Sequence, residues 1–200
     1  MSTLSTTNLK NPSSGSNNIV LAADGSATIT TLTGTTITGT SVRGGITSGT
    51  AVASTSGTSI DFTSIPSYVK RITVMFNGVS TNGASKLRVQ LGSGSVETSG
   101  YLGSSSAIAS ASAGSATFSS GFDLTDSEAA TALRRGIFTC TLLGSNLWVL
   151  SGTLSAQDVG YTTVTNGTKT TSGTLNRVRI TTVNGTDTFD AGSINILYEG

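Results

Sequence analysis

Three carboxylates close together in the sequence have the residue type and spacing to do chemistry. Asp123, Asp126 and Glu128 lie in one short segment, and glycosidases use a pair of carboxylates, one as general acid and the other as base or nucleophile. The same residues fit a structural role, because Asp126 and Glu128 would lie at a helix N-terminus, where negative charge is favourable. We expect the structural role and predict that the chain is not an enzyme.

Other common reaction chemistries lack their residues in this chain. The sequence has no histidine and one cysteine, Cys140, so it offers no Cys/His cluster for a transition metal and no imidazole to activate the thiol. Cys140 shares one face of its segment with Phe138 and Leu142, which predicts a small buried hydrophobe. No Gly-rich segment carries the Lys-Ser/Thr pair of a phosphate-binding loop. We therefore predict no metal and no cofactor.

Aromatic residues, which can stack on sugar rings, make up only 6% of the sequence. Tyr101 and Tyr161 lie among Gly and Ser residues, where loops would present them. We expect these two tyrosines to contact a receptor or glycan. The single tryptophan, Trp148, shares a face with Leu150, and we expect it to pack in the core.

The charged residues exclude some partners. The net charge is +1 with no basic run, so we expect neither nucleic acid nor an anionic membrane surface as a partner. No segment is long and apolar enough to span a membrane, and the start lacks the pattern of a signal peptide. The outward-facing Arg88, Arg177 and Arg179 are expected to solvate a sheet, and pairing with acids across subunits is the alternative.

Alternation of apolar and polar residues predicts half-buried strands in the second part of the chain. The residues predicted to face inward are Ile72, Val74, Phe76, Leu87, Val89, Leu91, Val178, Ile180, Ile194, Ile196 and Tyr198. Asn-Gly dipeptides at 77–78, 82–83, 166–167 and 184–185 are typical of tight hairpin turns. Together they predict an antiparallel β-sandwich in an all-β chain.

Two segments follow a different pattern. Thr125 could cap a helix with Glu128 three residues later, and Gly136 could end it, so we expect one short helix at residues 126–135. Residues 103–121 are almost all small, and both a mobile loop and strands in a tight gap fit them.

The N-terminal segment, residues 1–49, is poor in bulky apolar residues. Its few apolar side chains cannot form a core within one chain, so they need partners outside it. Identical chains wrapped about a threefold axis would share a narrow core and hide their strand edges. The residues expected in this trimeric stalk are Ile19, Leu21, Ile29, Leu32, Ile37 and Val42. A disordered Ser/Thr-rich linker is the alternative.

Two parts of the chain resemble segments of virion proteins from tailed bacteriophages. NLKNPSSGSNNIVLAADGSATI, residues 8–29, resembles a segment near the start of many phage fibre proteins. Residues 57–101, together with LLGSNLWVLSG and SGTLNRVRITTVNGTDTFDAGSINILYEG, resemble a C-terminal module of phage tail-fibre-like and structural proteins, including those of cyanophages.

The resemblance implies a homotrimeric fibre with an attachment segment and stalk at residues 1–49 and a knob at residues 50–200. On this basis we expect a structural tail fibre, joined through its N-terminus to another virion protein, in the baseplate rather than the capsid. The knob would adhere to a glycan or protein on the host surface. A capsid fibre or decoration protein is the first alternative, and a polysaccharide-degrading tailspike is the second. A protein made in the host cytoplasm and localised in the virion needs no secretion signal.

Overall fold

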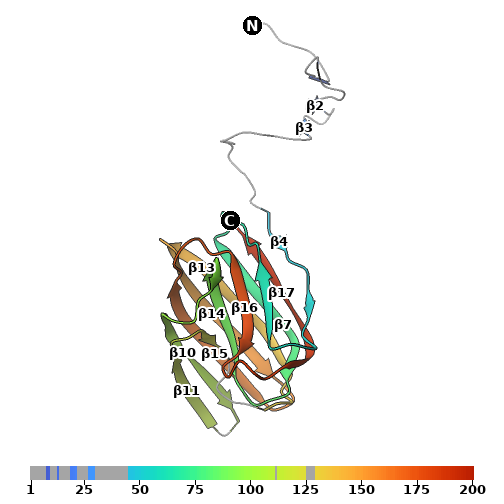
Figure 1. The fold of residues 1–200 in the computed structure, drawn as a ribbon. Coiled ribbons are helices and arrows are strands. Elements are labelled where there is room, and N and C mark those ends of the chain that lie inside the picture. The colour runs from blue at the N-terminus through green and yellow to red at the C-terminus, as the bar shows by residue number, and fades with distance from the viewer. Residues whose placement is uncertain are drawn as a thin grey trace. The chain divides into compact units, whose positions relative to one another are not determined.

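The chain divides into two compact units, Met1–Arg43 and Gly44–Gly200. The structure is a computed structural model that describes residues 8–9, 13, 19–21, 27–29, 45–110, 112–124 and 129–200. Within these ranges the chain forms strands, turns and irregular segments but no helix. Figure 1 shows the strands of the larger unit.

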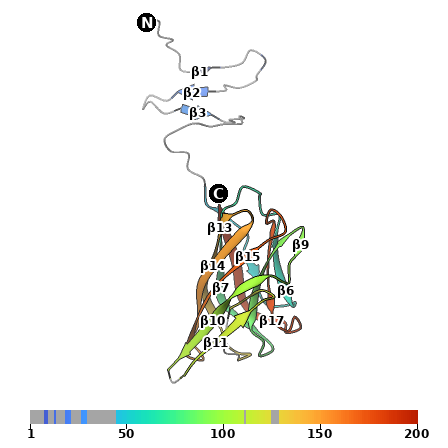
Figure 2. The same ribbon diagram turned by 90° about the vertical axis from the view of Figure 1, so that its left-hand side faces the viewer.

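Three short strands make up the described part of the N-terminal unit. β1 (Asn8–Leu9), β2 (Ile19–Leu21) and β3 (Ala27–Ile29) form an antiparallel sheet in chain order (Figure 2). Ile19 lies opposite Ile29 in this sheet. The predicted stalk residues Ile19, Leu21 and Ile29 are therefore strand residues, whereas Leu32, Ile37 and Val42 lie outside the described residues. The trimeric stalk stays a prediction.

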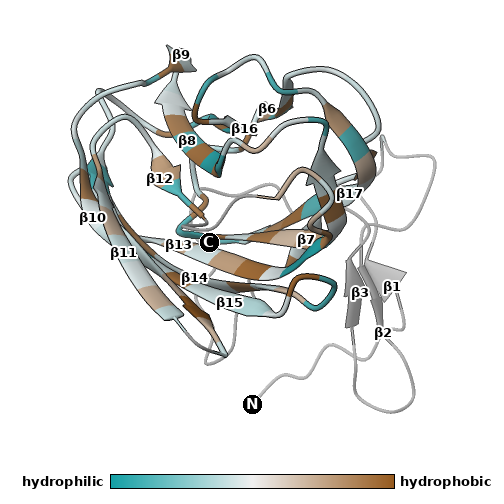
Figure 3. Cartoon of the chain, turned by 90° about the horizontal axis from the view of Figure 1, so that it is seen from below, coloured by the Kyte–Doolittle hydropathy of each residue, from teal (hydrophilic) through white to brown (hydrophobic). Residues whose placement is uncertain are grey.

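The C-terminal unit is a sandwich of two antiparallel sheets, as predicted (Figure 3). The large sheet has nine strands in the order β11 (Ser112–Phe118), β10 (Tyr101–Ala109), β15 (Tyr161–Thr170), β14 (Leu147–Ala156), β13 (Arg134–Gly144), β7 (Arg71–Thr81), β17 (Phe189–Glu199) and β4 (Thr47–Ser48), with β5 (Val52–Ala53) also paired to β17. The small sheet has five strands in the order β12 (Phe122–Asp123), β8 (Leu87–Ser93), β16 (Arg177–Thr182) and β6 (Ser59–Thr63), with β9 (Ser95–Val96) paired to β8.

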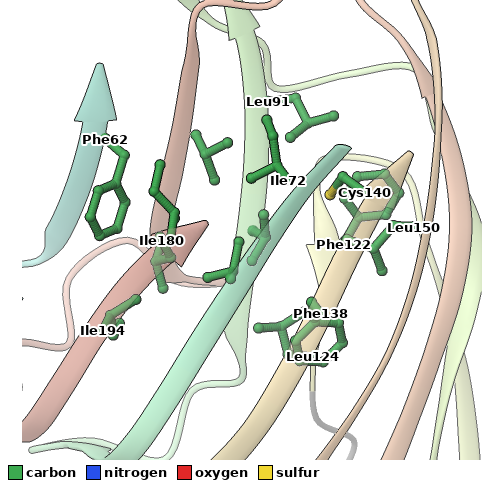
Figure 4. Close-up of a cluster of buried hydrophobic side chains, with 14 of the residues drawn as sticks. Phe62, Ile72, Leu91, Phe122, Leu124, Phe138, Cys140, Leu150, Ile180 and Ile194 are labelled. Atoms are coloured by element: carbon green, nitrogen blue, oxygen red, sulfur yellow. The ribbon is translucent and has the colours of Figure 1, made fainter. Parts of the chain in front are cut away.

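The core lies between the two sheets and is built from the alternating residues of each strand. The side chains predicted to face inward are all buried except Tyr198, which is partly buried and packs against the core. Figure 4 shows Ile72 and Phe138 of the large sheet near Leu91, Phe122 and Ile180 of the small one. Full burial of an aliphatic or Phe side chain contributes about 1.5–3 kcal/mol, so these alternating positions are the main favourable contribution to folding.

A small number of aromatic rings strengthen this core. The Phe122 ring meets two others edge to face, with centroids 4.9 Å from Tyr101 and 5.8 Å from Phe118. Phe76 and Phe138 form a similar pair at 5.9 Å. Such pairs add about 0.5–1.5 kcal/mol each beyond the burial of area. Few aromatic residues therefore suffice, because they are gathered in the sandwich.

Cys140 and Trp148 both point into the core, as predicted. Cys140 is fully buried, and burial raises the pKa of its thiol to about 12. Trp148 is 2% exposed. Neither side chain is available to a partner at the surface.

The segment of small residues, 103–121, which fitted a loop or strands, forms most of a hairpin. β10 and β11 pair in register from Gly103 opposite Phe118 to Ala109 opposite Ser112. β10 also pairs along its whole length with β15. Small side chains are needed here because Gly103 and Gly167 face each other, and a Cβ on Gly103 would lie 2.3 Å from the carbonyl oxygen of Asn166.

The predicted short helix at 126–135 is wrong in the part that the structure describes. Residues 129–133 form a turn and irregular chain, and Arg134 begins β13, whereas Asp126 and Glu128 lie outside the described residues. Arg134 pairs with Ala156 of β14 and with Val79 of β7. Pairing on both sides of the strand outweighs the weak local helix preference of the preceding alanines.

Two of the four Asn-Gly dipeptides lie inside strands, where hairpin turns were predicted. Gly78 of β7 has a φ of 65°, next to an irregularity in the pairing with β13. Gly167 of β15 packs tightly, because a Cβ there would lie 2.6 Å from the carbonyl oxygen of Leu102. These glycines serve a bulge and a close approach rather than a turn.

The other two Asn-Gly dipeptides lie in loops that cross between the sheets. Residues 82–83 lie between β7 and β8, and residues 184–185 lie between β16 and β17. The two loops hold each other, because the Asn82 backbone N–H donates to the Thr188 carbonyl at 2.9 Å and the Thr188 N–H donates to Asn82 Oδ1 at 2.9 Å. A two-residue hairpin turn occurs instead at Ser145 and Asn146, with φ values of 47° and 63°.

The division between the units falls earlier than the predicted boundary at residue 49. Thr47 and Ser48 of β4 pair with Tyr198 and Leu197 of β17, and β5 pairs with the same strand. The end of the predicted stalk segment is thus an edge of the large sheet.

Candidate functional site

The two tyrosines expected to contact a ligand are buried, and that prediction is wrong. Tyr101 is 0% exposed, and its hydroxyl accepts a hydrogen bond from the Leu91 N–H at 2.8 Å and lies 2.9 Å from the Glu97 carbonyl oxygen, to which it can donate. Burial raises the pKa of Tyr101. Tyr161 is 5% exposed and packs with Ala132 and Ala156. Both tyrosines are the first residue of a strand, β10 or β15, and both face inward.

A buried ion pair adjoins Tyr101. Lys169 Nζ lies 2.6 Å from Glu97 Oε2 and 5.2 Å from the centre of the Tyr101 ring. Glu97 Oε1 also accepts hydrogen bonds from the backbone N–H and hydroxyl of Ser172, both at 2.8 Å. Burial alone would raise the pKa of Glu97, but the hydrogen bonds from Lys169 and Ser172 outweigh it and hold the pKa below its usual value. This group joins the segment after β9 to the end of β15.

Of the three candidate catalytic carboxylates, the structure describes only that of Asp123. Its Oδ1 accepts from Arg88 Nε at 2.6 Å and its Oδ2 from Arg88 Nη2 at 3.2 Å. Asp126 and Glu128 lie outside the described residues, so the spacing within the trio is not on view. A carboxylate that accepts two bonds from one guanidinium suits a structural role.

The outward arginines were expected to solvate the sheet, but two of them form ion pairs within the chain. Arg179 Nε and Nη2 both donate to the Asp61 carboxylate at 2.7 Å, and Arg88 binds Asp123. Strand register causes both pairs, because Arg179 lies directly opposite Asp61 and Asp123 lies opposite Arg88. The hydrogen bond to Asp61 raises the pKa of Arg179.

A hollow of about 250 Å³ lies between these two ion pairs on the outer face of the small sheet. We call it the arginine hollow. Its lining is mostly polar and includes Ser59, Arg88, Gln90, Arg179, Thr181 and Asn184. Gln90 lies directly opposite Arg179, and Arg88 lies opposite Thr181. These pairings bring together residues about ninety positions apart in the sequence.

The charges around the hollow follow the strand order β12, β8, β16, β6. In that order the residues are Asp123, Arg88, Arg179 and Asp61, so the two guanidinium groups are the inner members and the two carboxylates the outer ones. Arg88 and Arg179 are diagonal neighbours across β8 and β16, a relation that places residues about 7–8 Å apart. The polar positions were visible in the sequence, but the pairing of β8 with β16 was not.

The outer face of the large sheet is different in kind. It carries exposed aliphatic side chains from four neighbouring strands, separated by Ser, Thr and Asn. We call this the aliphatic face and define it by Leu102, Ile108, Ile137, Val149 and Val164. Their places on one face follow from the register, in which Leu102 and Val149 both lie opposite Thr168 while Ile137 and Val164 both lie opposite Thr153.

Charge is almost absent from this part of the sheet. Strands β10, β11, β14 and β15 contain one charged residue, Lys169, and it points inward. Strand β13, which contributes Ile137, adds one exposed charge to this face, Arg135. Strand β11 ends the sheet, has no Lys or Pro, and is exposed along most of its length. Edge strands of stable monomers are usually protected by such residues, by bulges or by a covering segment. The aliphatic face and β11 are thus an exposed apolar surface beside an edge strand without these protective residues.

The part of the chain that the structure describes has neither a metal site nor a membrane-spanning helix. It contains no group of three His, Cys, Asp or Glu residues placed to hold a metal ion. It also contains no helix that is long and apolar enough to cross a membrane.

Comparison with known proteins does not place the chain in a family. No protein family, no curated protein and no solved structure matches it.

Proposed function

We propose that this chain is a structural virion protein that assembles as a homotrimeric fibre and adheres to the host surface. The C-terminal sandwich acts as the knob. The N-terminal unit forms the stalk and joins another virion protein, which we place in the tail or baseplate.

The observation that carries the proposal is an aliphatic face with little charge, next to an edge strand that has no Lys or Pro. Ile137 is 54% exposed, Ile108 is 58% exposed and Leu102 is 71% exposed on a sheet whose inner face is already packed. Apolar surface of this kind is stabilised by contact with a partner. A second and third copy of the same chain are the simplest partner, because cyclic closure covers the same patch on every subunit.

Adhesion is proposed rather than hydrolysis. Asp123, the candidate acid that the structure describes, is held by two hydrogen bonds from Arg88. Both of its carboxylate oxygens are engaged by this one guanidinium, an arrangement that suits a structural role.

Light scattering on the purified full-length chain tests the assembly directly. We expect the mass of three chains, and a monomer at micromolar concentration would overturn the proposal. Polar replacement of Ile29, Leu32 or Ile37 should loosen the trimer and leave the knob folded. If these variants remain fully trimeric, the N-terminal unit is a tether and not a stalk.

Location on the particle is a separate test. Electron microscopy of the intact virion with this chain labelled should place it on the tail. A position on the capsid would show a head fibre instead of a tail fibre. Absence from purified virions would overturn the proposed function.

A further inference from the structure

We propose that the arginine hollow is a binding site for an acidic saccharide, with the carboxylate of the sugar held between Arg88 and Arg179. This proposal deepens the adhesive function proposed above and rests on it. The ligand class follows from three features of the hollow, namely its charge order, its hydrogen-bonding groups and its size.

The charge order favours an anion at the centre of the hollow. Each guanidinium uses Nε and Nη2 on its own aspartate, which leaves Nη1 outside the ion pair. The residues between the two arginines in the sheet are Gln90 and Thr181, and neither carries charge. Each guanidinium is balanced by its own aspartate, and the two remaining Nη1 groups are the donors that a carboxylate placed between the arginines could use.

A structural role explains the two ion pairs but not their order. Cross-strand pairs stabilise a sheet when opposite charges face each other, and neighbouring like charges oppose this. An arrangement with the aspartates on the inner strands would form the same pairs. The observed order, with both cations inward over a hollow, is the one that can take an anionic ligand.

The remaining lining residues suit the hydroxyl groups of a sugar. Gln90 lines the hollow and is held by a hydrogen bond from its Nε2 to the Ser120 carbonyl oxygen at 2.8 Å, which leaves its amide oxygen outside that bond. Thr181 donates its hydroxyl to the Thr58 carbonyl at 2.8 Å, so its oxygen can still accept a hydrogen bond. The Thr181 hydroxyl oxygen and the Gln90 amide oxygen can accept hydrogen bonds from sugar hydroxyl groups, and the second N–H of the Gln90 amide can donate one.

The size of the hollow indicates one unit of a longer chain. Its volume of about 250 Å³ lies below the range of about 300–1,000 Å³ that is usual for enclosing a drug-sized ligand. An open hollow on a sheet face can take a single acidic sugar while the neighbouring sugars stay in solvent. Affinity per site is then weak, and several copies in one fibre raise the overall avidity.

The site is held in place before any ligand arrives. The side chains of Arg88 and Asp123 are each 13% exposed. The Arg88 stem lies against Gly121, where a Cβ would come within 2.5 Å of its Cδ. Fixed side chains lose little conformational entropy on binding.

Calorimetric titration of the full-length chain with trigalacturonate, and with maltotriose as the neutral counterpart, tests the proposal. We expect heat of binding with trigalacturonate only, weakened by salt because charge contributes to it. Arg179→Gln should weaken binding about tenfold or more, the effect of losing a charge-assisted hydrogen bond. Arg177→Gln is the matched control, since Arg177 lies on the same face of β16 but outside the lining.

A second variant keeps the test informative if Arg179→Gln unfolds. Gln90→Glu places a carboxylate between the two guanidinium groups, so it should abolish trigalacturonate binding in a chain that circular dichroism shows to be folded. Binding by Gln90→Glu equal to the wild type would overturn the site. An equal loss in Arg177→Gln and Arg179→Gln would also overturn it, because it would indicate diffuse attraction to positive charge.

The oligomeric state, measured on the same samples, separates this proposal from the fibre proposal. A trimer that binds no trigalacturonate would overturn the saccharide site and support the fibre proposal. A monomer that binds trigalacturonate with the expected variant pattern would support the saccharide site and overturn the fibre proposal. Binding of inorganic sulfate without any binding of trigalacturonate would show a simple anion site and overturn the saccharide assignment.

Discussion

The outer faces of the two sheets differ in charge, although the inner faces are alike. On the small sheet, Asp61, Arg88, Asp123, Arg177 and Arg179 point outward from four strands. On the large sheet, the outward residues of β10, β14 and β15 are Ser, Thr, Asn and aliphatic side chains. Charged faces are stable in water, whereas an uncharged aliphatic face gains from being covered. On this difference we propose ligand contact for the small sheet and self-association for the large one.

The largest expected effect is on assembly. Val164→Asp places a charge in the middle of the aliphatic face, opposite Ser106 and Thr153, and burial of unpaired carboxylates in a trimer interface costs several kcal/mol. We expect the trimer to dissociate, as measured by light scattering. Thr63→Asp, on the exposed outer face of the small sheet, is the control and should remain trimeric. If both variants dissociate equally, the two faces do not divide the roles as proposed.

The next effect is a loss in the free energy of unfolding, which should differ between the two ion pairs of the small sheet. Asp123→Asn should lower the free energy of unfolding by about 1.5–3 kcal/mol, as for hydrogen bonds to a charged group away from solvent. Asp61→Asn should cost about 0.2–1 kcal/mol, because the Arg179 and Asp61 side chains are 36% and 35% exposed. Urea denaturation measures both. Equal losses would mean that exposure does not distinguish the pairs.

Acid should reduce the stability that Glu97 contributes through its contacts with Lys169 and Ser172. A folded-state pKa held below the unfolded value contributes stability above the unfolded pKa, near 4.5, and this stability is lost as pH falls through the folded pKa. The melting temperature should therefore fall as pH drops below about 4.5. Glu97→Gln should remove part of this dependence, and an unchanged pH profile in the variant would contradict it.

The smallest expected effect is on the reactivity of Cys140. Because burial raises the pKa of this thiol to about 12, iodoacetamide should not label the folded chain at pH values near 8, where an exposed cysteine reacts. Labelling in urea, followed by mass spectrometry, is the control. Fast labelling of the native protein would show that the inner face of the large sheet opens readily.

Strand identity was predictable because the side chains of a strand alternate between two faces. Ile72, Leu87 and Val178 were assigned inward from their neighbours alone, and all three are fully buried. Turn positions were less predictable, because Asn-Gly dipeptides also fit bulges and close contacts, as Gly78 and Gly167 do. The helix expected near Arg134 failed for a related reason, since local propensity is weaker than pairing with two neighbouring strands.

The candidate site was predictable only in its residue types. Arginines on the polar side of two strands were recognised, but their partners Asp61 and Asp123 depend on register between distant segments. Tyr101 and Tyr161 were misplaced because Gly and Ser neighbours are as common in a closely packed sheet as in a loop. In this chain the small residues of β10 and β15 allow the backbones to approach.

The sequence by itself determined the all-β class, the inward residues of the main strands and the scarcity of charge, because these depend on composition and on a period of two residues. Only the tertiary structure decided which strands are neighbours. That choice brings Arg88 beside Arg179 and gathers Leu102, Val164 and Ile137 on one face. Pairing between strands is set by how all inward side chains fill one shared core, and no local pattern contains that information.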